Sequence, residues 1–398
     1  MSFPFFKRKK KHFLALDLGT EAVKVLVIEE VNGKNIALGG AVEYLDQGND
    51  LYRIDTLKKT ILRASAEVQD RVGIVPKSAI LGLPGDILKA RIFHQSCSRK
   101  SSKKTISLEE KNDICRKIIK QSQEGIAKLF FKETGISPAD ILFVDFEILE
   151  TKIDGYVVSS LLGLTGSKIE FDILIIFMPK HIEKYGNCDF EFFKKTIENL
   201  GWEISRIVHP LQNLINANPE NDAIFLDVGG FLTQIILVEN QKLKRIDDFN
   251  IGGENFSQAL SADLGITMER ARILKHKYSG KVLSEPTRAK IRRIISPCLR
   301  DWFRALKTKL LDKKNLLPKN IILIGGGSML PEIPEILATG DWEPIRFFGK
   351  IKIKCVRPKD LNSVYPEFIN NSNTLQYTPS LLLCGSESLT FKFNHAEK

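Results

Sequence analysis

The stretch Phe225-Leu-Asp-Val-Gly-Gly-Phe-Leu-Thr-Gln-Ile-Ile-Leu-Val238 predicts two strands joined by a tight turn. Residues 224–226 and 235–238 are apolar and rich in β-branched side chains, and Asp227-Val-Gly-Gly lies between them. Glycines let backbone N–H groups approach phosphate oxygens, and a carboxylate at the end of a strand can hold Mg²⁺. Most hairpins of this kind are only turns, so the stretch becomes informative when the chain repeats it.

The chain does repeat this pattern. Phe13-Leu-Ala-Leu-Asp-Leu-Gly-Thr20 places a second aspartate before a glycine, and Asn320-Ile-Ile-Leu-Ile-Gly-Gly-Gly-Ser-Met-Leu-Pro331 opens a strand into a glycine loop. The three stretches together suit a nucleotide clamped between two lobes. Two hairpins would hold the phosphates, and the third loop would let adenosine lie against backbone. The glycine fingerprints of dinucleotide-binding folds and of P-loops are absent.

Length and composition favour an ordinary soluble protein of two or more lobes. The chain has 398 residues, 43% hydrophobic and 27% charged. The apolar run at 171–178 is too short to span a bilayer, and the start lacks the pattern of a secretory signal peptide. The six cysteines form no Cys-x-x-Cys pair, so we expect no zinc site and a reducing cytoplasm.

The net charge of +11 is concentrated at the start of the chain. The run Lys7-Arg-Lys-Lys-Lys11 supplies five of these charges and leaves +6 for the other residues. Phe3, Phe5 and Phe6 precede the run, and aromatics beside lysines suit an anionic membrane surface, where each basic residue contributes roughly 1 kcal/mol. A solvated, disordered tail is the alternative.

The first part of the chain predicts a lobe of strands with one helix. Hydrophobic alternation indicates two strands over 13–30 and a third over 36–44, and helical spacing over 55–73 is followed by a strand at 79–84. This order suggests an actin-like lobe. A buried strand at 171–178, a helix at 190–200 and a strand at 202–208 are expected to return to it.

Residues 85–166 are expected to form a separate module. The polar, basic stretch 95–105 predicts a mobile loop, and Ser107-Leu-Glu-Glu caps a helix running to about residue 131. Two strands are expected, at 141–149 and 156–162.

The last part of the chain predicts helices and two further strands. Three helices are expected over 254–264, 268–278 and 287–311, and strands at 351–356 and 388–393. The third helix carries eight lysines and arginines around an apolar stripe. We interpret them as a solvated face, because no aromatic platform or DNA-binding motif accompanies them.

Taken in order, these motifs resemble the actin-like ATPase superfamily, specifically its FtsA/PilM branch. The resemblance covers nearly the whole chain and implies an α/β, actin-like (ribonuclease H-like) two-lobed fold with a small inserted α+β subdomain in the first lobe. It assigns a basic tail to 1–12, the first lobe to 13–84 and 171–220, the insert to 85–170, and the second lobe to 221–398, with its helical part at about 254–312.

The same resemblance implies ATP and Mg²⁺ as ligands. Asp17 and Asp227 would hold the metal, through water. The residues implied to bind nucleotide are Asp17, Gly19, Thr20, Lys24, Asp227, Gly229, Gly230, Thr233, Gly252, Gly253, Lys275, Gly325, Gly326, Gly327 and Ser328.

Three positions depart from the family pattern. Phe231 stands where a third glycine normally follows, Gln234 where an acid is frequent, and Arg272 where a glutamate is expected. Nucleotide binding is therefore expected more than efficient hydrolysis, and no catalytic residue is assigned.

The implied role is that of a cytoplasmic scaffold in bacterial cell division, peripheral at the inner face of the membrane. It would recruit protein partners and could assemble into filaments or rings. The alternative is a PilM-like protein of type IV pilus assembly that binds a cytoplasmic peptide of an inner-membrane pilus protein. The Phe- and Lys-rich start favours PilM, and no C-terminal amphipathic membrane helix is evident. A sugar kinase is disfavoured because no substrate-side catalytic aspartate is recognisable, and no specific nucleic-acid partner is expected.

Overall fold

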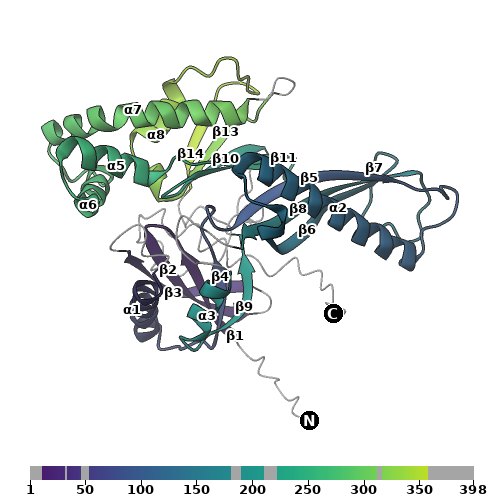
Figure 1. Ribbon diagram of the computed structural model, residues 1–398. Helices are drawn as coiled ribbons and strands as arrows, with labels where there is room; N and C mark the ends of the chain where they lie inside the picture. The colour runs from purple at the N-terminus through teal and green to yellow at the C-terminus, as the bar shows by residue number, and fades with distance from the viewer. Residues whose placement is uncertain are drawn as a thin grey trace, which may run out of the picture.

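The computed structural model describes residues 11–31, 34–45, 53–180, 190–209, 222–311 and 316–356. These residues form three sheets, which Figure 1 shows as a lower lobe, an upper lobe and an arm that extends to one side. The fold is the expected actin-like one. The predicted tail and the strand expected at 388–393 lie outside the described residues, apart from Lys11 and His12.

The first lobe is a five-stranded sheet in the order β3-β2-β1-β4-β9. β1 runs antiparallel to β2 and parallel to β4, so both ends of the first glycine turn are fixed by sheet pairing. Helix α1 packs Leu57, Ile61, Ala64 and Val68 against the sheet, as their helical spacing predicts. The elements are β1 (Lys11–Leu18), β2 (Ala22–Val31), β3 (Lys34–Tyr44), α1 (Ile54–Val72), β4 (Ser78–Gly82), α3 (Phe190–Glu198) and β9 (Glu203–Val208).

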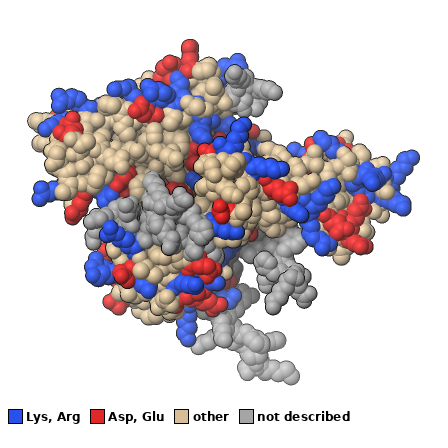
Figure 2. Space-filling view, in the orientation of Figure 1, with Lys and Arg blue, Asp and Glu red and all other residues tan. Residues whose placement is uncertain are grey.

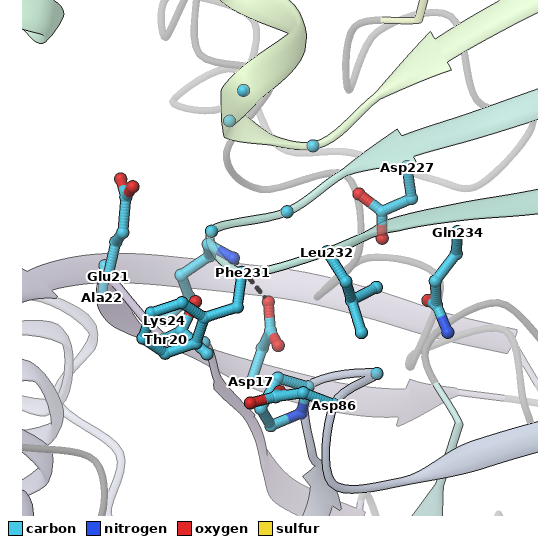
Figure 3. Close-up of a pocket in the computed structure, with 18 of the residues that line it drawn as sticks. Asp17, Thr20, Glu21, Ala22, Lys24, Asp86, Asp227, Phe231, Leu232 and Gln234 are labelled. Atoms are coloured by element: carbon cyan, nitrogen blue, oxygen red, sulfur yellow. Dashed lines mark hydrogen bonds and ion pairs between the residues drawn. The ribbon is translucent and has the colours of Figure 1, made fainter. Parts of the chain in front are cut away.

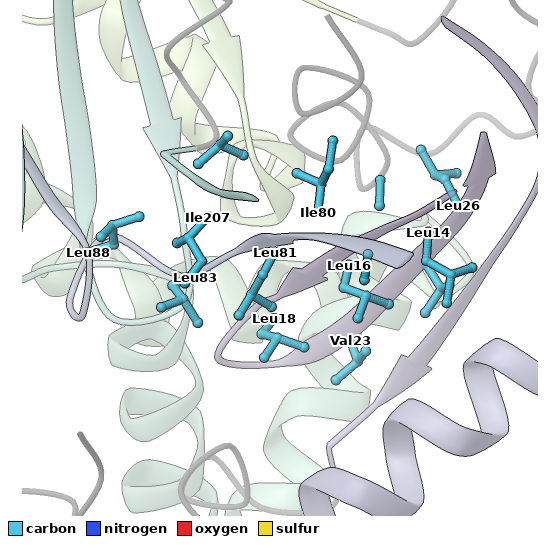
Figure 4. Close-up of a cluster of buried hydrophobic side chains, with 14 of the residues drawn as sticks. Leu14, Leu16, Leu18, Val23, Leu26, Ile80, Leu81, Leu83, Leu88 and Ile207 are labelled. Carbon is cyan, nitrogen blue, oxygen red and sulfur yellow. The ribbon is translucent and has the colours of Figure 1, made fainter. Parts of the chain in front are cut away.

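The core of this lobe contains continuous apolar runs rather than alternating ones. Leu14, Leu16 and Leu18 are fully buried, and so are neighbours such as Ala15 that point to the opposite face of the same strand. A strand buried on both faces needs apolar residues at successive positions. Figure 4 shows part of this cluster, with side chains from β1, β2, β4 and β9.

The second lobe repeats the plan of the first, in the order β12-β11-β10-β13-β14. β10 runs antiparallel to β11 and parallel to β13, as β1 does to β2 and β4. Within its described residues, four α-helices complete the lobe. The elements are β10 (Ala223–Val228), β11 (Thr233–Glu239), β12 (Lys242–Phe249), α5 (Gly253–Leu264), α6 (Met268–Ser279), α7 (Glu285–Leu310), β13 (Asn320–Ile324), α8 (Glu332–Thr339) and β14 (Lys352–Cys355).

Helix α7 buries its apolar stripe and exposes much of its basic face. Ile291, Ile295 and Trp302 belong to the second lobe's core, whereas Arg293 and Arg300 are exposed. Figure 2 shows blue side chains along the upper edge of the molecule, where Figure 1 places this helix. The part of the chain that the structure describes has no helix long and apolar enough to cross a membrane.

The arm in Figure 1 is a four-stranded sheet in the order β5-β8-β6-β7, covered by the long helix α2. Ser107 caps α2 as expected, with its hydroxyl accepting a hydrogen bond from the Glu110 N–H at 3.1 Å. The elements are β5 (Lys89–Ser98), α2 (Leu108–Thr134), the short 3₁₀ turn η2 (Pro138–Asp140), β6 (Ile141–Ile153), β7 (Tyr156–Val157) and β8 (Lys168–Pro179).

Three expectations for this module are wrong. The strand predicted at 171–178 is part of β8, which pairs with β5 and β6 in the arm rather than with the first lobe. Both faces of β8 are apolar, so its sequence does not say which sheet it joins. The expected mobile loop at 95–105 instead begins within β5, and Arg99 is buried, with its guanidinium paired to Glu110. The strand expected at 156–162 is only the two residues of β7.

Candidate functional site

The site lies where the two lobes face each other, at the ends of their equivalent strands. Asp17 comes near the end of β1 and pairs in register with Gly82 of β4. Asp227 occupies the same place in the second lobe, in register with Ile324 of β13, directly before the glycine loop. Because parallel strands end at one edge of a sheet, each aspartate reaches the cleft beside its own hairpin turn.

A cavity of about 120 Å³ lies between these turns (Figure 3). Most of its walls come from the predicted stretches, and the start of β2, the short loop after β4, Tyr44 of β3 and His276 of α6 supply the rest. The lining residues are Asp17, Gly19, Thr20, Glu21, Ala22, Lys24, Tyr44, Pro84, Gly85, Asp86, Asp227, Gly229, Gly230, Phe231, Leu232, Gln234, His276, Gly325, Gly326 and Gly327. Ligand pockets for whole small molecules typically measure roughly 300–1,000 Å³, so the cleft is narrow in this conformation.

The charges at the centre of the cavity are strongly coupled. Lys24 Nζ donates a hydrogen bond to Asp17 Oδ2 at 2.7 Å, the dashed line of Figure 3, because the two residues face each other across the β1–β2 ladder. Burial raises the pKa of Asp227 to about 6, with Asp17 adding to the effect and Lys24 opposing it. The cavity therefore presents carboxylates that favour a cation between them.

Two glycines permit the close approach of the loops. A Cβ atom on Gly230 would lie 2.1 Å from Thr20 Oγ1, so the second hairpin can touch the first only without a side chain there. Gly325 has φ +83°, and a Cβ on it would lie 2.2 Å from Asp227 Oδ1. Both glycines are therefore needed for the close packing of the loops around the cavity.

The nucleotide-binding set predicted from the sequence divides into two groups. Ten of its members line the cavity: Asp17, Gly19, Thr20, Lys24, Asp227, Gly229, Gly230, Gly325, Gly326 and Gly327. Thr233 does not line it. Its hydroxyl donates to the Ile251 carbonyl and accepts a hydrogen bond from Trp302 Nε1, both at 2.8 Å, and the residue is fully buried in the second lobe.

Ser328, Gly252, Gly253 and Lys275 also do not line the cavity. The Ser328 hydroxyl donates to the Gly325 carbonyl at 2.6 Å and so holds the glycine loop. The Gly253 N–H donates to the Gly229 carbonyl at 2.8 Å, which supports the second hairpin turn from outside. Lys275 donates to Glu21 and to the Gly253 carbonyl. These four residues are placed to shape the cavity in this conformation.

The sequence analysis noted that Gln234 replaces a frequent acid but did not predict that it lines the cavity. Gln234 pairs in register with Asp227, and Thr233 pairs with Val228. Cross-strand partners point to the same face of a sheet, so strict alternation would have predicted Gln234 rather than Thr233 on the side of the aspartate. The Gln234 amide also contacts His209, with 3.1 Å between the two Nε2 atoms. Burial lowers the pKa of His209 to about 3, with nearby Lys89 and Arg91 contributing.

The residues present fit a magnesium nucleotide better than a metal alone. Mg²⁺ is commonly held by one or two carboxylates, waters and substrate phosphates, and Asp17 and Asp227 supply two carboxylates. Within the described ranges, no group of three or more His, Cys, Asp and Glu side chains is placed to hold a metal ion. Phe231 lines the cavity at the turn where the family pattern has glycine.

Comparisons with known proteins agree with this geometry. No family model matches the chain. The cell division protein FtsA of Streptococcus pneumoniae is 26% identical over 384 residues, which cover 89% of this chain and 78% of the relative. FtsA of Enterococcus hirae is 23% identical, covering 93% and 83%. A solved structure of the PilM–PilN type IV pilus biogenesis complex has the same fold, with a TM-score of 0.64 at 15% identity, covering 93% of this chain and 97% of that one. The chain thus resembles the FtsA/PilM branch of the actin-like ATPase superfamily, FtsA in sequence and PilM in fold.

Proposed function

We propose that this protein is a nucleotide-binding, actin-like scaffold of the FtsA type that acts in bacterial cell division. The observation that supports this role is the FtsA likeness over 89% of the chain, combined with two aspartate turns that face one cavity. The protein would work in the cytoplasm, at the inner face of the membrane, by recruiting protein partners and by self-assembly.

The ligand proposed for the cavity is ATP with Mg²⁺. The phosphates would lie between the turns at Gly19 and Gly229, and adenosine against Gly325–Gly327. Asp17 and Asp227 would hold the metal through water, and Lys24 would stabilise phosphate charge. When bound, Mg²⁺ neutralises phosphate charge and orients the nucleotide. Because Phe231 lines the cavity where the family pattern has glycine, slow turnover is expected.

Isothermal calorimetry tests the ligand. Mg-ATP should bind with a micromolar dissociation constant, and binding should be lost in Asp17→Ala and Asp227→Ala. Asp263→Ala is the matched control, because it removes an exposed aspartate from α5. Absence of heat with both ATP and ADP in the wild type would refute a nucleotide site.

Localisation tests the cellular role. A fluorescent fusion at its native level should concentrate at the division plane, and depletion should block septation. The PilM-like alternative, supported by the fold match at TM-score 0.64, predicts instead the capture of an inner-membrane pilus protein and loss of pili on depletion. Normal division after depletion would contradict the FtsA-like role.

The membrane contact is proposed for the tail that holds Phe3, Phe5, Phe6 and the run Lys7 to Lys11. Deleting residues 2–11 should weaken co-sedimentation with anionic liposomes. Equal co-sedimentation of the truncated and complete proteins would place the contact elsewhere.

A further inference from the structure

One carboxylate at the mouth of the cavity crosses from the first lobe to the second. Glu21 lies in the turn between β1 and β2, and its Oε1 accepts a hydrogen bond from Lys275 Nζ of α6 at 2.7 Å. His276 Nε2 lies 3.6 Å from the other carboxylate oxygen. Figure 3 shows Glu21 at the end of the turn with its carboxylate directed away from the Asp17–Lys24 pair. Glu21 therefore links the lobes at a place separate from that central pair.

The lysine end of the bridge is buried and is held by a second hydrogen bond. The Lys275 side chain is only 6% exposed, and its Nζ also donates to the Gly253 carbonyl at 3.1 Å. Burial opposes ionisation of Glu21, but Lys275 and His276 outweigh it and hold the pKa of this carboxyl well below its usual range. A second cross-lobe contact lies beside it. The Tyr44 ring packs edge-on against the His276 ring, with 5.3 Å between the ring centroids.

Other cations around the cleft are also held by carboxylates of the chain itself. Lys24 is paired with Asp17, and Arg272, one turn before Lys275 on α6, is paired with Glu254. In this conformation an anionic ligand must displace an internal partner before it can use Lys275.

We infer that Glu21 competes with the ligand for Lys275. It holds the two lobes together across the cleft while the ligand is absent, and it yields Lys275 when an anionic ligand enters. The competition part rests on the proposed nucleotide function, whereas closure without ligand does not. In the opposite arrangement, Glu21 would clamp the lobes around a bound nucleotide. The test must distinguish this arrangement from competition.

Small-angle X-ray scattering of the nucleotide-free protein tests closure. Glu21→Gln keeps the shape of the side chain and removes its charge, so the radius of gyration should increase. Glu67→Gln is the matched control, because it removes an exposed ion pair with Arg71 inside α1 and should leave the radius unchanged. Exchanging the charges in a Glu21→Lys, Lys275→Glu double variant should restore the compact form. An unchanged radius in folded Glu21→Gln, checked by circular dichroism, overturns the closure claim.

Calorimetry with Mg-ATP tests the competition. Glu21→Gln should bind at least fivefold more tightly than the wild type, because Lys275 is no longer occupied. Unchanged or weaker binding would overturn competition and, when weaker, identify Glu21 as a clamp of the bound state. If neither protein binds Mg-ATP, the proposed function and the competition fail together, while the scattering result still decides closure.

Discussion

Two of the contacts between the second lobe and the rest of the molecule contrast with each other. At the front of the cavity, Glu21 reaches Lys275 and His276 of α6. Behind the cavity, Asp248 of β12 lies between Lys89 and Arg91 of the arm, at 3.5 Å and 2.9 Å. The front contact uses a lysine that sequence reasoning assigned to the ligand. The rear contact uses residues that no ligand motif includes, and it joins the lobe to the inserted module.

The contrast indicates that the two contacts have different roles. A contact that shares a group with the ligand can respond to the ligand, whereas one built from unrelated buried charges can remain in place. Gln234 connects the two regions, since it lines the cavity and pairs in register with Asp248. We therefore expect the rear contact to act as a fixed joint and the front contact as the part that changes.

The largest effect is expected from breaking the rear contact. Asp248→Ala leaves Lys89 buried without its main counter-charge, and burial already lowers the pKa of Lys89. The free energy of unfolding should fall by about 3 kcal/mol in chemical denaturation. Asp301→Ala, which removes an exposed i,i+3 pair with Arg304, should cost less than about 0.5 kcal/mol. Equal losses of unfolding free energy in both variants would show that the rear contact does not hold the second lobe to the arm.

The next effect separates ligand response from stability. Mg-ATP at 100 times its dissociation constant should raise the free energy of unfolding of the wild type by about 2.7 kcal/mol. Asp248→Asn should keep this ligand-dependent increase, whereas Asp227→Ala should lose it, and chelation of Mg²⁺ should reduce it in the wild type. Loss of the increase in Asp248→Asn would mean that the rear contact also belongs to the ligand site.

Acid should weaken the rear region through His209. Its folded pKa of about 3 lies below the ordinary value of 6.5, so its contribution to stability is present above 6.5 and is lost as the pH falls towards 3. Between pH 7 and pH 5 this contribution should decrease by roughly 2 kcal/mol. His209→Gln should reduce the difference between the denaturation midpoints measured at these two pH values. An unchanged difference would assign the acid sensitivity to other groups.

The smallest effect is expected at the cavity wall. Phe231→Gly restores the family's third glycine and should tighten Mg-ATP binding or raise turnover several-fold, on the order of 1 kcal/mol. Leu232→Ala, a neighbouring lining residue, controls for a general gain in space. If Phe231→Gly changes neither affinity nor rate, its ring does not obstruct the ligand.

Local signals in the sequence were sufficient for the strands and turns that carry the aspartates. Asp17 and Asp227 each follow an apolar strand and precede glycine, and the structure brings both to one cavity. Long-range choices were not predictable in the same way. β8 has apolar residues on both faces, so nothing local says that it pairs within the arm.

The parts of the site that the sequence did not predict have the same origin. Thr233 was assigned by its place in a motif, although the hairpin register turns its side chain into the core and Gln234 into the cavity. Glu21 and Lys275 are 254 positions apart, so no sequence window contains their contact. Motifs located the cavity, and only the packing of the lobes showed which side chains its walls use.

The most direct test of the account is a crystal structure with Mg²⁺ and a non-hydrolysable ATP analogue. The account predicts phosphates between the turns of Asp17 and Asp227, adenosine against Gly325–Gly327, and Lys275 Nζ moved from Glu21 to the ligand. A nucleotide bound elsewhere, or one bound in the cavity while Lys275 keeps its 2.7 Å contact with Glu21, would contradict it.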